Sequence, residues 1–158
     1  MYFISILAII AVTLIASGSP NPKAIIDAPS LVIVLLICIP ILISSGLLKD
    51  FNNAFRIALN RKKEAGLIEI KRAIEAIGLT IHTLFYSAFF LFAISLIAIL
   101  RSLSDLASLG PNLAVAFLTC IYSLALALVL LPIKSILTVR AIEFMQQPEE
   151  ENKQEETE

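Results

Sequence analysis

The chain has 158 residues, of which 58% are hydrophobic and 16% are charged, and its mean hydropathy is +0.91. A soluble domain of this length would be about 45–50% apolar and about 25% charged. The formal net charge of −1 gives no reason to expect a nucleic-acid partner. Composition and charge together exclude an ordinary soluble domain and indicate a protein that folds in a membrane.

Four long runs of the sequence carry no Asp, Glu, Lys or Arg: residues 1–22, 28–48, 76–100 and 106–133. Each run is close to the roughly 20 residues with which an α-helix crosses the apolar core of a bilayer. Strands of a membrane barrel would be about 10 residues long and would alternate in polarity, which these runs do not. We therefore expect an all-α membrane protein with four transmembrane helices, at about residues 2–16, 31–48, 77–100 and 111–137.

The distribution of basic residues predicts the orientation, because Lys and Arg are in excess on the cytoplasmic side of membrane proteins. With both termini in the cytoplasm, ten of the twelve basic residues lie inside and only Lys23 and Arg101 lie outside. The alternative for residues 1–16 is a cleaved signal peptide. No Lys or Arg precedes their apolar core, so we expect a retained first span.

The sequence divides into a membrane domain, residues 1–145, and a terminal segment, residues 146–158. The terminal segment holds six Glu and no large apolar residue, so it is expected to be a disordered acidic tail.

Residues 49–76 form the one sizeable charged segment between spans, and apolar residues recur there at helical spacing. We expect two short amphipathic cytoplasmic helices with a break at Gly66. One interpretation is that they extend the second and third spans, with Arg61, Lys62 and Lys63 contacting lipid phosphates. The other is that these basic residues form a docking surface for a partner.

Two prolines mark expected features of the fourth span. Pro111 suits a helix start, where its missing N–H costs nothing. Pro132 lies deep in the span and predicts a bend near its cytoplasmic end. Ser30 is expected to cap the second span.

Small polar residues gather on one face of the third span (Thr80, Thr83, Ser87) and on one face of the fourth (Asn112, Thr119, Ser123, with Tyr122 beside them). They are candidates for lining a narrow ion path. The alternative is that their hydroxyls bond back to their own helices or allow close helix packing. Cys38 and Cys120 fit small packing residues, and His82 fits a helix end at the membrane interface.

The charge-free runs hold no carboxylate, Lys or Arg that could act as a proton relay. If the chain moves ions, the titrating group must come from another chain. A second histidine, a phosphate-binding Gly-rich loop and a metal-ligand spacing are all missing from the sequence. We therefore expect no enzyme activity, no cofactor, no metal and no nucleic-acid binding.

The segments Gly110–Ser123 and Leu130–Ile133 resemble the last transmembrane helix of MotA, the A subunit of the flagellar stator, in the MotA/TolQ/ExbB proton-channel family. Residues 26–34 resemble that family's junction between outer loop and second helix, and residues 100–109 resemble its turn between the third and fourth helices. The resemblance covers about residues 25–50 and 90–140.

The resemblance implies a homo-oligomer, a pentamer in this class, that rings single-span B-type partners in the bacterial inner membrane. The B chain brings a membrane Asp as proton carrier, and its protonation drives the motor. On span four, the resemblance makes Thr119, Cys120 and Ser123 the ion-path candidates.

Two departures from the family pattern bear on this reading. The family's path has a threonine on each of its last two helices, and these positions match Phe92 and Cys120 here. The cytoplasmic insertion that grips a flagellar rotor is reduced to about 28 residues, so rotor engagement in the usual way is not expected. The alternatives are a non-conducting membrane scaffold with the stator fold and an unrelated four-helix transporter.

Overall fold

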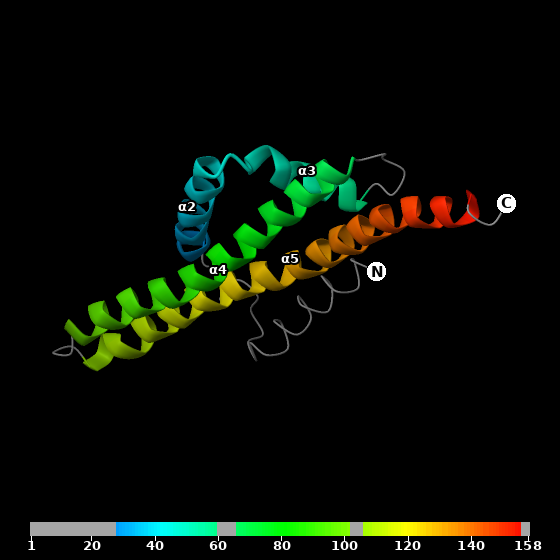
Figure 1. The fold of residues 1–158 in the computed structure, drawn as a ribbon. Coiled ribbons are helices and arrows are strands. Elements are labelled where there is room, and N and C mark those ends of the chain that lie inside the picture. The colour runs from blue at the N-terminus through cyan, green and yellow to red at the C-terminus, as the bar shows by residue number, and fades with distance from the viewer. Residues whose placement is uncertain (1–27, 60–65, 102–105, 156–158) are drawn as a thin grey trace.

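The computed structural model describes residues 28–59, 66–101 and 106–155, and their secondary structure is helical. The four helices are α2 (Ala28–Ser44), α3 (Leu48–Leu59), α4 (Leu67–Arg101) and α5 (Leu106–Glu155). Figure 1 shows α4 and α5 side by side as a long antiparallel pair, with α2 and α3 lying along one side of it. The predicted all-α class is confirmed for these residues.

Two of the described helices are long and apolar enough to cross a membrane, by length and composition: Leu67–Arg101 and the part Leu109–Gln146 of α5. The bent pair of α2 and α3 gives a third candidate if it is counted as one span. The expected first span, residues 2–16, lies outside the described residues. The structure therefore supplies two or three of the four expected spans.

The second span differs from its predicted range, 31–48, because α2 ends at Ser44 and the axis turns by 102° into α3. Gly46 has a φ of 69°, a left-handed conformation that glycine adopts without steric cost. Its N–H donates to the Ile43 carbonyl at 3.0 Å, and the Leu47 N–H donates to the Leu42 carbonyl at 3.2 Å. This bonding pattern closes a helix with a left-handed glycine just past its end.

The third span is one continuous helix with the charged segment before it, in agreement with the interpretation that this segment extends the span. α4 runs for 35 residues, and the expected break, Gly66, lies directly before its first residue. Residues 67–77 are mostly strong helix formers without Pro or Gly, so nothing interrupts the helix before the apolar run begins.

The fourth span is longer than predicted at both ends. α5 starts at Leu106, so Pro111 lies inside the helix instead of starting it. At the other end, the backbone is helical as far as Glu155, within the segment predicted to be a disordered tail. The Glu, Gln and Lys residues there have good helix propensity, which favours propagation of the helix.

The core joins all four helices. α2 contributes a stripe at four-residue spacing, Val34, Cys38 and Leu42, and α3 contributes its apolar face. The principal buried apolar residues of α3, α4 and α5 are Ala54, Ile57, Ala58, Ile70, Ala73, Ile77, Leu84, Ala127, Leu130, Ile133, Leu137 and Ala141. Within a membrane such side chains leave lipid and not water, so close packing holds these helices together.

Two polar contacts hold α3 against the long pair. The Arg140 guanidinium of α5 donates from Nη1 to the Ile57 carbonyl oxygen at 2.6 Å. Arg72 of α4 forms an ion pair with Asp50 at 2.9 Å. The ion pair is partly exposed and contributes at most about 1 kcal/mol. The hydrogen bond from Arg140 satisfies the Ile57 carbonyl in the last turn of α3, where carbonyls have no N–H partner within the helix.

Candidate functional site

Among the described residues, six hydroxyl side chains are buried inside the bundle: Ser30, Thr80, Thr83, Ser87, Thr119 and Ser123. They come from α2, α4 and α5, which all contact one another. Four of the five predicted ion-path residues belong to this group, and we call it the hydroxyl cluster. The fifth, Cys120, is half-buried beside Thr119, and its thiol is free.

One contact of the hydroxyl cluster joins two helices directly. Thr119 Oγ1 of α5 lies 3.0 Å from Ser30 Oγ of α2 and 3.1 Å from the Val115 carbonyl oxygen. A hydroxyl has one proton to donate, so Thr119 can serve only one of these acceptors at a time. When Thr119 donates to Val115, Ser30 can donate to Thr119.

The other hydroxyls whose bonds are described donate to carbonyls of their own helices. Ser123 donates to the Thr119 carbonyl at 3.3 Å, Thr80 to the Ala76 carbonyl at 2.8 Å, and Ser87 to the Leu84 carbonyl at 2.9 Å. Such bonds satisfy a polar group inside an apolar helix without a partner helix. In this conformation these hydroxyls bond within the bundle, which fits one of the two interpretations that the sequence left open.

The hydroxyls of α4 lie away from its contact with α5 at the outer end. There, Phe92 packs on Phe117 with ring centroids 5.0 Å apart. At 100° per residue, Ser87 lies about 140° around the helix from Phe92. The buried α4 hydroxyls therefore lie on a different side of the helix from the contact between Phe92 and Phe117. The position at which the family resemblance expects a threonine is filled by an aromatic ring that contacts Phe117 of α5 in a tilted arrangement.

The two proline candidates lie within α5. Pro111 is exposed near its first turns, and Pro132 is half-buried close to the charged end of the helix. Arg61, Lys62 and Lys63, the predicted lipid or partner contacts, lie outside the described residues.

The boundary of the charge-free region is marked by a contact between α4 and α5. Lys134 of α5 extends over Gly78 of α4, and its Nζ lies 3.3 Å from where a Cβ at Gly78 would be. Because Gly78 has no side chain, the end of the Lys134 side chain fits between α4 and α5 at this position. His82, one turn further along α4, is exposed.

Sequence reasoning assigned Ser30 a capping role, whereas the residue lies inside α2 and is 1% exposed. A signal for its true position existed. Ser30, Val34, Cys38 and Leu42 recur every fourth residue, which places them on one helix face. The approach of Lys134 to Gly78 was also not predicted, because predicting it requires the register between α4 and α5.

In the part of the chain that the structure describes, no group of three or more His, Cys, Asp or Glu side chains is placed to hold a metal ion. The chemistry that the cluster offers is that of hydroxyls and one thiol. These groups can pass or orient a proton, but they cannot carry charge across a bilayer by themselves.

Comparison with known proteins identifies one region. Residues 92–150 match the sequence profile of the MotA/TolQ/ExbB proton channel family. The matched region covers the outer end of α4 and most of α5, including Thr119, Cys120 and Ser123. The match confirms the family resemblance, and it does not distinguish MotA from the other members. No curated protein and no solved structure matches the chain significantly.

Proposed function

We propose that the chain, of which residues 92–150 match the MotA/TolQ/ExbB proton channel family, is an A-type subunit of a proton-driven, stator-like membrane complex. In this proposal a homopentameric ring of the chain surrounds a single-span B-type partner that carries a titrating Asp. The complex lies in the bacterial inner membrane, and the chain itself is not an enzyme.

One observation carries the proposal beyond the family match. The charge-free stretches of α4 and α5, residues 76–100 and 106–133, contain no carboxylate, although the family transports protons. Proton transport through a membrane needs an ionisable group within it. A companion chain with an acid in its span supplies that group.

The test is to co-express the chain with the product of its neighbouring gene and purify the complex from membranes. Native mass spectrometry should give several copies of this chain together with the companion. Vesicles containing the complex should take up protons, and Thr119→Ala, or Cys120→Ala combined with Ser123→Ala, should slow the uptake. Thr138→Ala is the matched control, because this exposed threonine bonds only to the Lys134 carbonyl. A single-copy particle without a companion would contradict the proposal.

A second candidate function is a non-conducting membrane scaffold with the same fold. It is favoured by the contact between the rings of Phe92 and Phe117 and by Cys120 at the other expected threonine position. A companion chain without a membrane acid, or a purified ring that takes up no protons, would support the scaffold over the motor.

A further inference from the structure

The short helix α3 presents a polar face to its surroundings. Lys49, Asn52 and Arg56 lie within about 60° of one another around the helix, and all three are exposed. The other side of α3, with Ala54 and Ile57, is buried in the core that it shares with α4 and α5. We call Lys49, Asn52 and Arg56 the basic face of α3.

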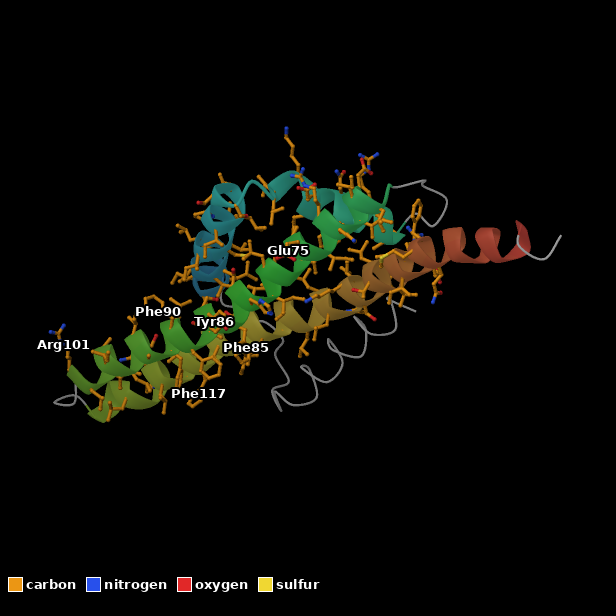
Figure 2. The ribbon with its side chains drawn as sticks, in the orientation of Figure 1. Glu75, Phe85, Tyr86, Phe90, Arg101 and Phe117 are labelled. Carbon is orange, nitrogen blue, oxygen red and sulfur yellow. The ribbon has the colours of Figure 1, made fainter. Side chains whose placement is uncertain are left out.

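The direction of α3 places this face at the surface of the membrane. α2 has 17 residues, none of them charged, and the axis turns by 102° from α2 into α3. With α2 across the membrane, as the sequence predicts, a helix that follows a turn close to a right angle lies nearly parallel to the membrane plane, at the level of the headgroups. Figure 2 shows nitrogen-tipped side chains extending outward from the region of α3, whereas Arg101 lies at the far end of α4.

Two large apolar side chains border the basic face. Leu48 is 40% exposed and Leu59 is 77% exposed, and they lie about 20° apart around α3, at its two ends. Helices that lie in the membrane interface combine such an apolar edge with neighbouring cations. The apolar side chains enter the boundary of the acyl chains, and the long Lys and Arg side chains reach the phosphates.

The acid of α3 is already neutralised within the structure. Asp50 forms an ion pair with Arg72 of α4 at 2.9 Å, and Arg72 Nε also donates to the same carboxylate oxygen at 3.2 Å. Within the described ranges, neither Lys49 nor Arg56 takes part in an ion pair. Their positive charges are therefore left for an anion from outside the described part of the chain.

The sequence shows which acids the rest of the chain can offer. Residues 1–22 carry no charge, and Asp27 adjoins Ala28, at the end of α2 away from α3. Residues 60–65 hold one acid, Glu64, among three basic residues, and seven basic residues stand against four acidic ones over residues 49–76. The segment around the basic face is therefore positive, and the remaining acids at this end are glutamates from Glu143 onward.

We propose that the basic face of α3 binds the headgroup of an anionic phospholipid. The Arg56 guanidinium offers paired donors to a phosphate, and Lys49 adds a second positive charge. Asn52, one turn from each, can donate an amide N–H to a headgroup oxygen. A free phosphate shares this chemistry, but only a lipid also brings acyl chains to Leu48 and Leu59. Binding of this kind needs only that the chain lies in a membrane, and it does not depend on proton transport or on a companion chain.

The test uses tryptophan fluorescence, because the sequence contains no Trp. Leu59→Trp places a reporter beside Arg56, and Leu48→Trp places one beside Lys49. The full chain is reconstituted in phosphatidylcholine vesicles that contain either brominated phosphatidylglycerol or brominated phosphatidylcholine, since bromine quenches Trp on contact. Quenching at equal mole fractions gives the relative affinity of the face for the anionic lipid. We expect a preference for phosphatidylglycerol of about tenfold.

Neutral substitutions locate the charges that produce this preference. Arg56→Gln should lower it about fivefold at the Leu59→Trp reporter, and Lys49→Gln should do the same at Leu48→Trp. Lys71→Gln is the matched control, because it removes a positive charge from an exposed position of α4 outside the basic face. It should leave the preference at both reporters unchanged.

Four results would overturn the inference. The first is equal quenching by the two lipids at both reporters. The second is a loss in Lys71→Gln as large as that in Arg56→Gln, which would show a general surface potential without a site. The third is loss of the preference when soluble glycerol phosphate is added, which would reassign the face to a free phosphate. The fourth is carbodiimide coupling of Lys49 to a glutamate from Glu143 onward in chains that show no lipid preference, which would give the face to that acidic segment.

Discussion

The hydroxyl oxygens of Ser30 and Thr119 lie 3.0 Å apart, although 89 residues separate them in the chain. Ser30 belongs to α2, whose other contacts with the long pair are apolar side chains such as Val34 and Leu42. Apolar contacts allow a helix to slide, whereas a hydrogen bond between two side chains fixes its height and rotation. This pair therefore sets the position of α2 against α5.

The first prediction concerns this pair. Ser30→Ala and Thr119→Val should each lower the free energy of unfolding by about 1 kcal/mol, because each removes an interhelical bond inside the bundle. The double variant should cost clearly less than the sum, since both changes remove the same bond. Unfolding of the purified protein in detergent measures these values. Thr138→Ala, which touches only its own helix, should be close to neutral. Additive effects in the double variant would show that the two hydroxyls are not coupled.

The second prediction concerns the end of α3. Arg140→Ala leaves the Ile57 carbonyl without the guanidinium that now bonds to it at 2.6 Å. The loss should weaken the last turn of α3 by about 1 kcal/mol and speed amide exchange in residues 54–59 roughly fivefold. Arg72→Ala removes an exposed ion pair with Asp50 and should have a smaller effect. Equal exchange in the two variants would argue against the role of Arg140.

The third prediction separates two glycines that have equal space around them. A Cβ at Gly46 or at Gly66 would meet nothing within 4 Å, but only Gly46 has a positive φ, +69°. Gly46→Ala should therefore destabilise the protein by about 1 kcal/mol, and Gly66→Ala should be neutral or slightly stabilising. Thermal unfolding of the two variants in the same detergent decides the matter. A destabilised Gly66→Ala would mean that its backbone is constrained in a way that the structure does not show.

The fourth prediction concerns the approach of Lys134 to Gly78. A Cβ at Gly78 would lie 3.3 Å from Nζ and 3.6 Å from Cε of Lys134, which are the flexible end of that side chain. Gly78→Ala should therefore be tolerated, and its gain in helix propensity of about 1 kcal/mol should raise the melting temperature. Gly78→Leu should displace Lys134 and expose its amine to acylating reagents. Unchanged acylation of Lys134 in Gly78→Leu would contradict the contact.

The membrane class and the helical elements follow from simple physics, because long charge-free runs have no other stable backbone in lipid. The break between α2 and α3 had a visible cause in Gly46, but an apolar run that continues to Leu48 hides it. The length of α4 could be interpreted in two ways. Amphipathic spacing before Ile77 and apolar spacing after it fit either two helices or one extended span, and no residue between them ends a helix, which agrees with the single helix observed.

The hydroxyl cluster was found from the sequence, but its partners were not. Helical spacing places Thr119 and Ser123 on one face, whereas their neighbours depend on the register between helices far apart in the chain. The position of Ser30 in the cluster depends on the register between α2 and α5, which the sequence does not give. The exposure of Tyr86 could not be predicted from the sequence, because it depends on which face of α4 the other helices cover.

The continuity of α4 has a mechanical consequence. A helix of 35 residues is a stiff rod about 52 Å long, and it passes without a hinge from the membrane interior to the face against which α3 rests. Any tilt imposed on its buried half by a neighbouring span must swing the opposite end, together with α3, as a lever does. Under the proposed function, a force applied to α4 within the membrane would reach α3 through one continuous helix.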